Sequence, residues 1–262
     1  MATIAYRAHG VRHVSSGVTM SAAPATRDSL PWYSAGKTAT GHVRRLNEDA
    51  FLDVREQGLW AVADGMGGHS RGDWASQCIV ETLHDFKRLD NPDASIEELM
   101  RRLEQANRLC LAESGDRIMG STVAALYLHD DKAYTLWAGD SRIYRFRGEA
   151  FSQLTDDHSL VQELHRLGEL TRDEADSHPS QNVITRAIGV AEELEVQVRQ
   201  FDLEAGDRFI LCSDGLFKDM KPAELRELAG LPSPRDALDR LMELALKRGG
   251  TDNLTAVVVQ VA

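Results

Sequence analysis

The chain has 262 residues, of which 42% are hydrophobic and 27% charged, the composition of an ordinary globular protein with one large domain or two small ones. Its formal net charge of −11 argues against nucleic-acid binding as the main task, because acidic surfaces repel a phosphate backbone. Three cysteines, Cys78, Cys110 and Cys212, lie in apolar patterns without metal-site spacing. This odd count indicates the reducing cytoplasm, and no apolar run reaches membrane-spanning length.

Residues 1–31 are rich in Ala, Ser, Thr and Arg and show no periodicity. Arg7 and Arg12 interrupt the apolar stretch that a signal peptide would need. We therefore expect a disordered N-terminal arm, with a start codon assigned too early or a partner-docking tail as the alternatives. The ordered part is expected to be a single domain over residues 32–262.

The first half of the ordered chain alternates strands and helices. A strand and turn begin at Trp32 and lead to Arg44, and short strands are predicted over residues 50–54 and 59–63. A glycine turn, GMGG at 65–68, comes next. Apolar residues at helical spacing then predict a helix over about residues 72–89, and Ser95 with Glu98 predicts a capping box that starts a second helix.

The second half begins with short strands over residues 121–128, 132–138, 143–147 and 150–154, which are predicted to form a meander. A short helix ending at Gly168 and a polar stretch to Pro179 are expected to form a mobile surface flap. Strands over 195–201 and 207–212, helices over 222–228 and 233–247, and a strand over 254–261 complete the order. Mostly sequential strands predict antiparallel sheets with helices outside them, an α+β layered domain.

Acidic residues recur beside the ends of predicted strands. They are Glu48, Asp49, Asp64, Asp140, Asp214 and Asp252. An Asp-Gly hairpin turn explains one such position, but it does not explain the recurrence. Carboxylates gathered at one place resist ionisation unless cations lie between them. Oxygen ligands without a Cys/His cluster favour a hard divalent ion, Mg²⁺ or Mn²⁺.

The glycine turn at 65–68 is not a nucleotide-binding loop. It lacks the G-K-[ST] sequence of a Walker A motif and the third glycine of a dinucleotide fingerprint. The turn is therefore interpreted together with the acidic residue that precedes it.

Eight segments resemble, in order, the motifs of the metal-dependent type 2C serine/threonine protein phosphatases (the PPM family) in their bacterial form. They are GHVRRLNEDAF (41–51), VADGMGGHSRG (62–72), GSTVAAL (120–126), WAGDSRIYRF (137–146), LTDDHSL (154–160), NVITRAIG (182–189), LCSDGLF (211–217) and GGTDNLTAVVV (249–259). Eight motifs in order are a specific signal. The resemblance implies a catalytic domain folded as a four-layer sandwich, two antiparallel β-sheets flanked by helix pairs, with a flap insertion.

The resemblance also implies a metal site. Asp64 would bridge two ions, and Gly65 would contribute its backbone carbonyl. The other ligands would be Asp214 and Asp252 for one ion, and Glu48 or Asp49 for the second ion, largely through water. Asp140 matches a third-metal position shared with Asp214. The expected cofactors are therefore two core Mn²⁺ or Mg²⁺ ions, with a place for a third.

Other matched positions concern the substrate. Arg44 would hold the substrate phosphate, since an arginine forks onto two phosphate oxygens. His69 is either the general acid that protonates the leaving oxygen or a structural loop histidine. His158 is expected to orient the start of the flap, and Arg186 to brace its return. One departure is Ala39, where many relatives have an aspartate, and we expect it to tune the site without loss of activity.

The expected reaction is hydrolysis of phosphoserine and phosphothreonine on proteins by a metal-bound water, in opposition to a bacterial Ser/Thr kinase. The expected partners are phosphoproteins, including that kinase and its targets, with no nucleic acid or membrane, and the protein is expected to be a cytoplasmic monomer. Two alternatives remain open. An inactive phosphoprotein-binding relative should have lost metal acids, and none is lost; a regulator of a sigma-factor pathway would retain the same chemistry.

Overall fold

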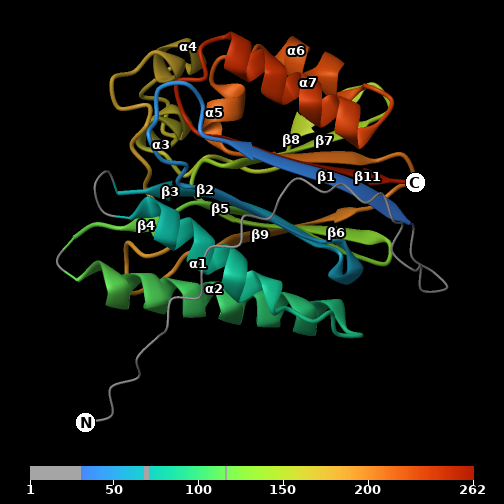
Figure 1. Cartoon of the computed structure of the whole chain (residues 1–262), viewed down its shortest axis with the longest axis horizontal. Helices are drawn as coiled ribbons and strands as arrows, with labels where there is room; N and C mark the ends of the chain where they lie inside the picture. Colours follow the sequence, from blue (N-terminus) through green and yellow to red (C-terminus); the bar gives the residue numbers. More distant parts are fainter. Residues whose placement is uncertain (1–30, 68–70, 116) are drawn as a thin grey trace.

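Two antiparallel β-sheets lie face to face at the centre of the molecule (Figure 1). The computed structural model describes residues 31–67, 71–115 and 117–262. The first sheet consists, in spatial order, of β1 (Trp32–Ala39), β11 (Leu254–Val261), β10 (Arg208–Cys212), β7 (Arg142–Arg147) and β8 (Ala150–Gln153). The second consists of β2 (Asp49–Val54), β3 (Leu59–Met66), β5 (Val123–His129), β6 (Lys132–Ala138) and β9 (Gln197–Asp202), with β4 (Gly120–Ser121) paired to β3.

Helices cover the outer face of each sheet (Figure 1). On the second sheet lie α1 (Gly72–His84) and α2 (Pro92–Ser114), and on the first lie α5 (Asp214–Phe217), α6 (Pro222–Ala229) and α7 (Pro234–Lys247). A short 3₁₀ helix, η1 (Arg55–Gln57), joins β2 to β3. The predicted α+β sandwich of two antiparallel sheets flanked by helix pairs is confirmed.

Three apolar layers hold this sandwich together, and β3 contributes to two of them. Leu59 and Ala61 face the α1–α2 pair, while Trp60 and Val62 face the opposite sheet. This alternation follows from the two-residue period of a strand. Burial on both faces explains why the sequence of β3 is a continuous apolar run. Trp60 and Trp137 are fully buried core residues.

The predicted start of the second helix is wrong. Asn91 is the N-cap of α2, because its side chain accepts a hydrogen bond from the Asp93 N–H at 2.8 Å and Pro92 occupies the first turn. Ser95 lies inside the helix, and its hydroxyl accepts a hydrogen bond from the Leu89 N–H at 3.0 Å. The first helix also ends earlier than expected, at His84.

The predicted meander is divided between the two sheets. β5 and β6 form a hairpin in the second sheet, and β7 and β8 form a hairpin in the first. Residues 139–141 cross from one sheet to the other, which places Asp140 at the crossing. The strand expected over 121–128 is interrupted at Thr122, where β4 ends and β5 begins.

β3 does not end at Ala63, the last residue of the predicted strand. It continues to Met66 because Gly65 and Met66 pair with Ser121 and Gly120 of β4. A side chain at Gly65 would have its Cβ 2.1 Å from the carbonyl oxygen of Gly72, at the start of α1. Glycine is therefore required where the strand and the helix meet.

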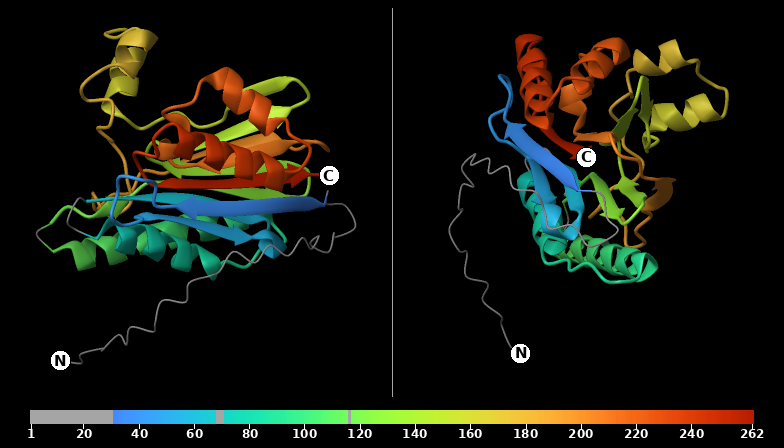
Figure 2. Two further views of the ribbon diagram at one scale, coloured as in Figure 1. Left: turned by 45° about the horizontal axis from the view of Figure 1, so that its top comes forward. Right: turned by 90° about the vertical axis from the view of Figure 1, so that its right-hand side faces the viewer.

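The expected flap lies between β8 and β9 and contains α3 (Leu160–Arg166) and α4 (Arg172–Asp176), which stand away from the sandwich (Figure 2). An isolated β-bridge between Ser159 and Ile184 closes its base, and the Leu160 N–H donates to the Val183 carbonyl at 2.9 Å. The flap is therefore a loop with two joined ends. Its mobility stays a prediction.

Two further expectations concern the ends of the chain and membranes. The arm expected over residues 1–31 lies outside the described residues except for Pro31. Among the described helices, none has both the length and the apolar character needed to cross a bilayer. Cys78, Cys110 and Cys212 are all buried free thiols, as their apolar surroundings predicted.

Candidate metal and phosphate site

Asp49 and Asp64 are register partners on β2 and β3. Asp49 is 8% exposed, and one of its carboxylate oxygens, Oδ2, accepts a hydrogen bond from the Ser213 hydroxyl at 2.7 Å. Burial raises the pKa of Asp49 to about 7. Burial also raises the pKa of Asp64 well above its usual range, and the next largest cause is the charge of Asp49. Both carboxylates therefore resist ionisation in the absence of a cation.

Asp140 and Asp214 lie near Asp49 and Asp64. We call these four aspartates, together with Glu48 and Asp252, the acidic group. Asp140 is 7% exposed at the crossing between sheets, and burial, followed by the charge of Asp214, raises its pKa to about 7. Asp214 is the first residue of α5, and its Oδ2 forms an ion pair with the ammonium of Lys218. The charges of Asp140 and Asp214 also raise the pKa of Asp64. These carboxylates thus share one electrostatic environment.

Asp252 belongs to the acidic group and is paired with Arg44 at its solvent-exposed edge. The Arg44 guanidinium donates to Asp252 Oδ2 at 2.8 Å, and the Arg44 side chain is 52% exposed. This hydrogen bond is the largest cause of the raised pKa of Arg44. Arg44 therefore lies at the edge of the acidic group with one side open to solvent.

Glu48 lies next to Asp49 but is bound differently. Its Oε1 accepts a hydrogen bond from the Gly72 N–H at 3.0 Å, at the start of α1. Its backbone carbonyl accepts from the Gly65 N–H at 3.0 Å and from the Ser76 hydroxyl at 2.6 Å. Burial raises the pKa of Glu48. Glu48 thus links the β2 strand, the Gly65 position and the first turn of α1.

Asn253, which was not among the predicted site residues, holds the loop that carries Arg44. Its Oδ1 accepts from the Glu48 N–H at 2.8 Å, and its Nδ2 donates to the carbonyls of Thr40 and Leu46 at 3.0 and 2.9 Å. The side chain is buried. The available signal was its position directly after Asp252 in the TDN segment, since an amide can satisfy an N–H and two carbonyls together.

Three hydroxyl and ammonium groups around the carboxylates were also missed. They are Ser213, Thr122 and Lys218. The Thr122 hydroxyl accepts from the Asp64 N–H at 3.1 Å and the Ser213 hydroxyl binds Asp49, so both fix the aspartates in place. Thr122 follows the strand β4 and Ser213 precedes Asp214 by one residue. Ser213 and Lys218 lie one and four residues from Asp214 in the chain, which was the available signal for these two, whereas Thr122 has no acidic neighbour in the sequence.

The donor set fits hard divalent cations. Two carboxylate oxygens, Asp49 Oδ1 and Asp214 Oδ1, are buried without a hydrogen-bond partner in the part of the chain that the structure describes. Buried oxygens of this kind are costly unless they meet a donor or a cation. As the described side chains stand, no three His, Cys, Asp or Glu residues are close enough together to hold a metal ion. Asp214 and Asp252 face Lys218 and Arg44, so metal binding would require them to exchange ion-pair partners.

Of the remaining predicted residues, His158 and Arg186 belong to the part of the chain that the structure describes, and His69 does not. His158 is buried; its Nδ1 accepts from the Gly139 N–H at 3.2 Å and its Nε2 contacts the Gln197 amide oxygen at 3.0 Å. Both ring nitrogens are therefore committed to the fold at the start of the flap. Arg186 forms an ion pair with Glu195 at 3.2 Å on the return of the flap.

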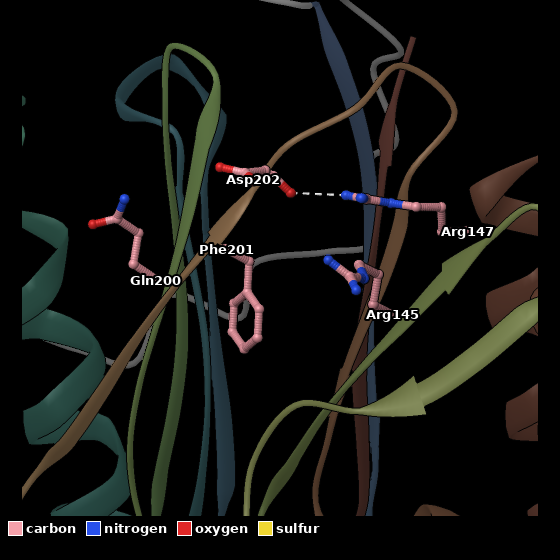
Figure 3. Close-up of a pocket in the computed structure, with 5 residues that line it drawn as sticks. All are labelled: Arg145, Arg147, Gln200, Phe201 and Asp202. Atoms are coloured by element: carbon pink, nitrogen blue, oxygen red, sulfur yellow. Dashed lines mark hydrogen bonds between the residues drawn. The ribbon is translucent and has the colours of Figure 1, made fainter.

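A recess of about 400 Å³ lies elsewhere, between β7 and β9 (Figure 3). Its lining residues are Arg145, Arg147, Gln200, Phe201 and Asp202. The register pairs Gln197 with Trp137 and Asp202 with Lys132, so the recess is at the end of β9 far from Asp140. This recess is separate from the acidic group.

Comparisons with known proteins identify the family of this chain. A family model described as protein phosphatase 2C matches residues 38–258. The serine/threonine phosphatase Stp of Listeria innocua is 35% identical over 238 residues, which cover 86% of this chain and 94% of that protein. The solved structure of PppA, described as a key regulatory component of the T6SS in Pseudomonas aeruginosa, is 42% identical, with a TM-score of 0.81 and coverage of 88% and 98%. The catalytic domain of the serine/threonine phosphatase PstP, solved with two manganese ions, is 32% identical, with a TM-score of 0.79 and the same coverage.

The layered fold and these relatives define a protein phosphatase. The chain belongs to the protein phosphatase 2C (PPM) family in its bacterial form. It is a serine/threonine protein phosphatase with a metal cofactor.

Proposed function

We propose that this chain hydrolyses phosphoserine and phosphothreonine on proteins with two divalent ions, Mn²⁺ or Mg²⁺, held by the acidic group. The observation that carries the proposal is the environment of Asp64, whose pKa is raised by burial and by four other aspartates. Such an environment is unfavourable unless cations neutralise it. The orphaned oxygens of Asp49 and Asp214 add support, because each lacks a donor in the described chain.

The proposed ligands follow from the position of each residue. Asp64 and the backbone carbonyl of Gly65 would help to hold the ions. The remaining ligands would be Glu48, Asp49, Asp214 and Asp252, with Asp140 and Asp214 available to a further ion. Bound divalent ions would lower the pKa of a water and offset charge on the phosphoryl oxygens.

Arg44 would position the substrate. Its guanidinium is half exposed and lies against Asp252, so it can turn from this carboxylate to a phosphate at the edge of the acidic group. A planar fork binds two phosphate oxygens at once. His69 is the proposed donor of the proton that the leaving serine or threonine oxygen takes up when its bond to phosphorus breaks.

The proposed substrates are phosphoproteins that a Ser/Thr kinase has modified, including the kinase itself, and the proposed location is the cytoplasm. The polar flap between β8 and β9 stands away from the sandwich and would contact the protein part of a substrate (Figure 2). The relative PppA is described as a regulatory component of the T6SS in its own organism, which offers one setting for such a phosphatase. The same chemistry would serve a kinase-linked or a sigma-factor pathway.

The test is metal-dependent hydrolysis of p-nitrophenyl phosphate and of a phosphothreonine peptide. Activity should require added Mn²⁺ or Mg²⁺ and disappear with EDTA. Asp64→Asn should lose nearly all activity and bind Mn²⁺ more weakly, while its melting temperature in EDTA stays at or above that of the wild type, since a neutral amide replaces a buried carboxyl whose ionisation is unfavourable. Asp85→Asn, at an exposed aspartate on the C-cap of α1, is the matched control. Full activity after dialysis against EDTA would refute the proposal. Phosphopeptide binding without turnover would support the inactive, phosphoprotein-binding alternative.

A further inference from the structure

Two aliphatic side chains are exposed on the loop that carries Arg44. Val43 is 65% exposed and Leu46 is 67% exposed, which places them among the most exposed large hydrophobic residues of the described chain. Val43 directly precedes Arg44, and Leu46 follows it by two residues. Single exposed aliphatic residues are ordinary, but two on one short loop form a small apolar surface. We call Val43 and Leu46 the aliphatic pair.

Hydrogen bonds hold the backbone of this loop in place. The Asn253 side chain donates to the carbonyls of Thr40 and Leu46 at 3.0 and 2.9 Å. The His42 N–H donates to the Gly250 carbonyl at 2.7 Å. The aliphatic pair therefore lies on a fixed backbone, so a ligand that contacts it does not have to order the loop first.

The aliphatic pair lies beside the proposed position of the substrate phosphate. Consecutive Cα atoms are about 3.8 Å apart, so the Cα atoms of Val43 and Leu46 lie within roughly 8 Å of the Cα atom of Arg44. An extended peptide advances by about 3.3 Å per residue. A substrate side chain within three positions of the phosphorylated residue can therefore reach the pair while Arg44 contacts the phosphate.

Charge does not favour one sign of flanking residue at this place. Arg44 and Arg45 on the loop are positive, whereas Asp252 beside Arg44 and Glu48 at the end of the loop are negative. A charged flanking side chain would meet groups of both signs. An aliphatic side chain gains from burial against the pair whatever the surrounding charges are.

We propose that Val43 and Leu46 select phosphoprotein substrates that have a large aliphatic residue within three positions of the phosphoserine or phosphothreonine. The inference rests on the proposed function, because it assumes that Arg44 binds the phosphate of a protein substrate. The contact would remove apolar surface of both partners from water. A leucine of the substrate that contacts the pair should raise kcat/KM about 5- to 20-fold.

The experiment uses phosphothreonine peptides with serine at all flanking positions, except for one leucine that is moved through the three positions on either side. With saturating Mn²⁺, the wild-type full chain should hydrolyse at least one leucine peptide about 5- to 20-fold more efficiently than the all-serine peptide, mainly through a lower KM. Val43→Ser and Leu46→Ser should each reduce this preference, and the double variant should abolish it. Leu46→Met should retain it, because methionine has a similar apolar volume. Leu89→Ser, at a leucine outside this loop that is 43% exposed, is the matched control.

Each alternative gives a different result. Equal kcat/KM for all peptides with wild type would overturn the role of the pair, and so would a preference that the double variant retains. If the double variant instead changes only the sedimentation of the chain, the pair is a contact between two copies and the inference fails. If folded wild type with Mn²⁺ hydrolyses none of the phosphopeptides, the proposed function fails instead. Melting temperatures of the variants, which should match wild type because both side chains are exposed, separate these results from a folding defect.

Discussion

Asp49 and Asp64 face each other as register partners, one at the first residue of β2 and the other two residues before the end of β3. Neither forms an ion pair in the described chain, and burial raises the pKa of both. Their backbone positions are fixed by strand pairing, so the two residues stay neighbours and only side-chain rotation can move the carboxylates apart. The fold therefore maintains an unfavourable charge arrangement that a cation would relieve.

This arrangement predicts an unusual pH dependence for the metal-free protein. Asp49 and Asp140 have folded pKa values of about 7, against an ordinary 3.8. Between these pH values the folded state holds more protons than the unfolded state, so the free energy of unfolding falls as the pH rises. We expect a loss of about 1–4 kcal/mol between about pH 5 and pH 8, as measured by urea unfolding in EDTA.

One substitution and one added ligand serve as controls for the pH effect. Asp140→Asn should flatten the decline, because one of the responsible carboxyls no longer titrates. Saturating Mn²⁺ should restore stability at the higher pH, since the ions bind the folded state. Stability that increases with pH in EDTA would contradict the assignment.

Arg44→Ala should raise KM for a phosphopeptide about 10- to 150-fold, the equivalent of a charge-assisted contact worth ~1.5–3 kcal/mol, and leave kcat nearly unchanged. The substrate phosphate already carries its charge in the ground state, so the contact is equally strong before and during transfer. Arg44→Lys should recover only part of the loss, because a point charge cannot form a fork. Arg45→Ala, at the exposed neighbour, is the control. An unchanged KM with kcat reduced about a thousandfold would show that Arg44 acts on the transition state.

Asn253→Ala should destabilise the protein by about 1–3 kcal/mol and raise KM, because the loop from Thr40 to Glu48 loses three hydrogen bonds. Urea unfolding and steady-state kinetics on one phosphopeptide measure the two effects. Asn253→Asp keeps the acceptor for the Glu48 N–H but loses both donors, so it should be defective as well. Wild-type KM in a destabilised Asn253→Ala protein would limit this residue to a role in stability.

The flap can be removed at its base. Leu160 and Val183 are hydrogen-bonded neighbours, so two glycines can replace residues 161–182 without stretching the chain. Rates on phosphoproteins should fall about tenfold, while hydrolysis of p-nitrophenyl phosphate, which is too small to contact the flap, should change less than about twofold. The bidentate contact between Arg142 and Asp157, which fixes the chain before the flap, remains in this variant. Equal losses on both substrates would indicate a direct catalytic role or a folding defect.

Local patterns determined much of what the sequence could predict. The apolar run of β3, the helical spacing of α1 and α7 and the acidic residues beside strand ends are all visible within a few residues, because periodic burial leaves a periodic sequence. The start of the second helix was predicted wrongly because two N-terminal signals lie within a few residues of each other. Ser95 and Glu98 match a capping box, but Asn91 and Pro92 four and three residues earlier form the actual start of α2.

Other features depend on which strands become neighbours, and that is decided by the packing of the whole chain. The crossing of residues 139–141 between sheets puts Asp140 near Asp214, although the sequence shows only a meander. The hydrogen bonds from Asn253 to the Arg44 loop join residues more than 200 positions apart in the chain. A local sequence pattern therefore cannot reveal them. The sequence by itself thus determined the elements, the family resemblance and the acidic residues, since these depend on local spacing and residue type. Only the tertiary structure decided which carboxylates are buried together and which are paired with Lys218 and Arg44, because charge and burial act through space.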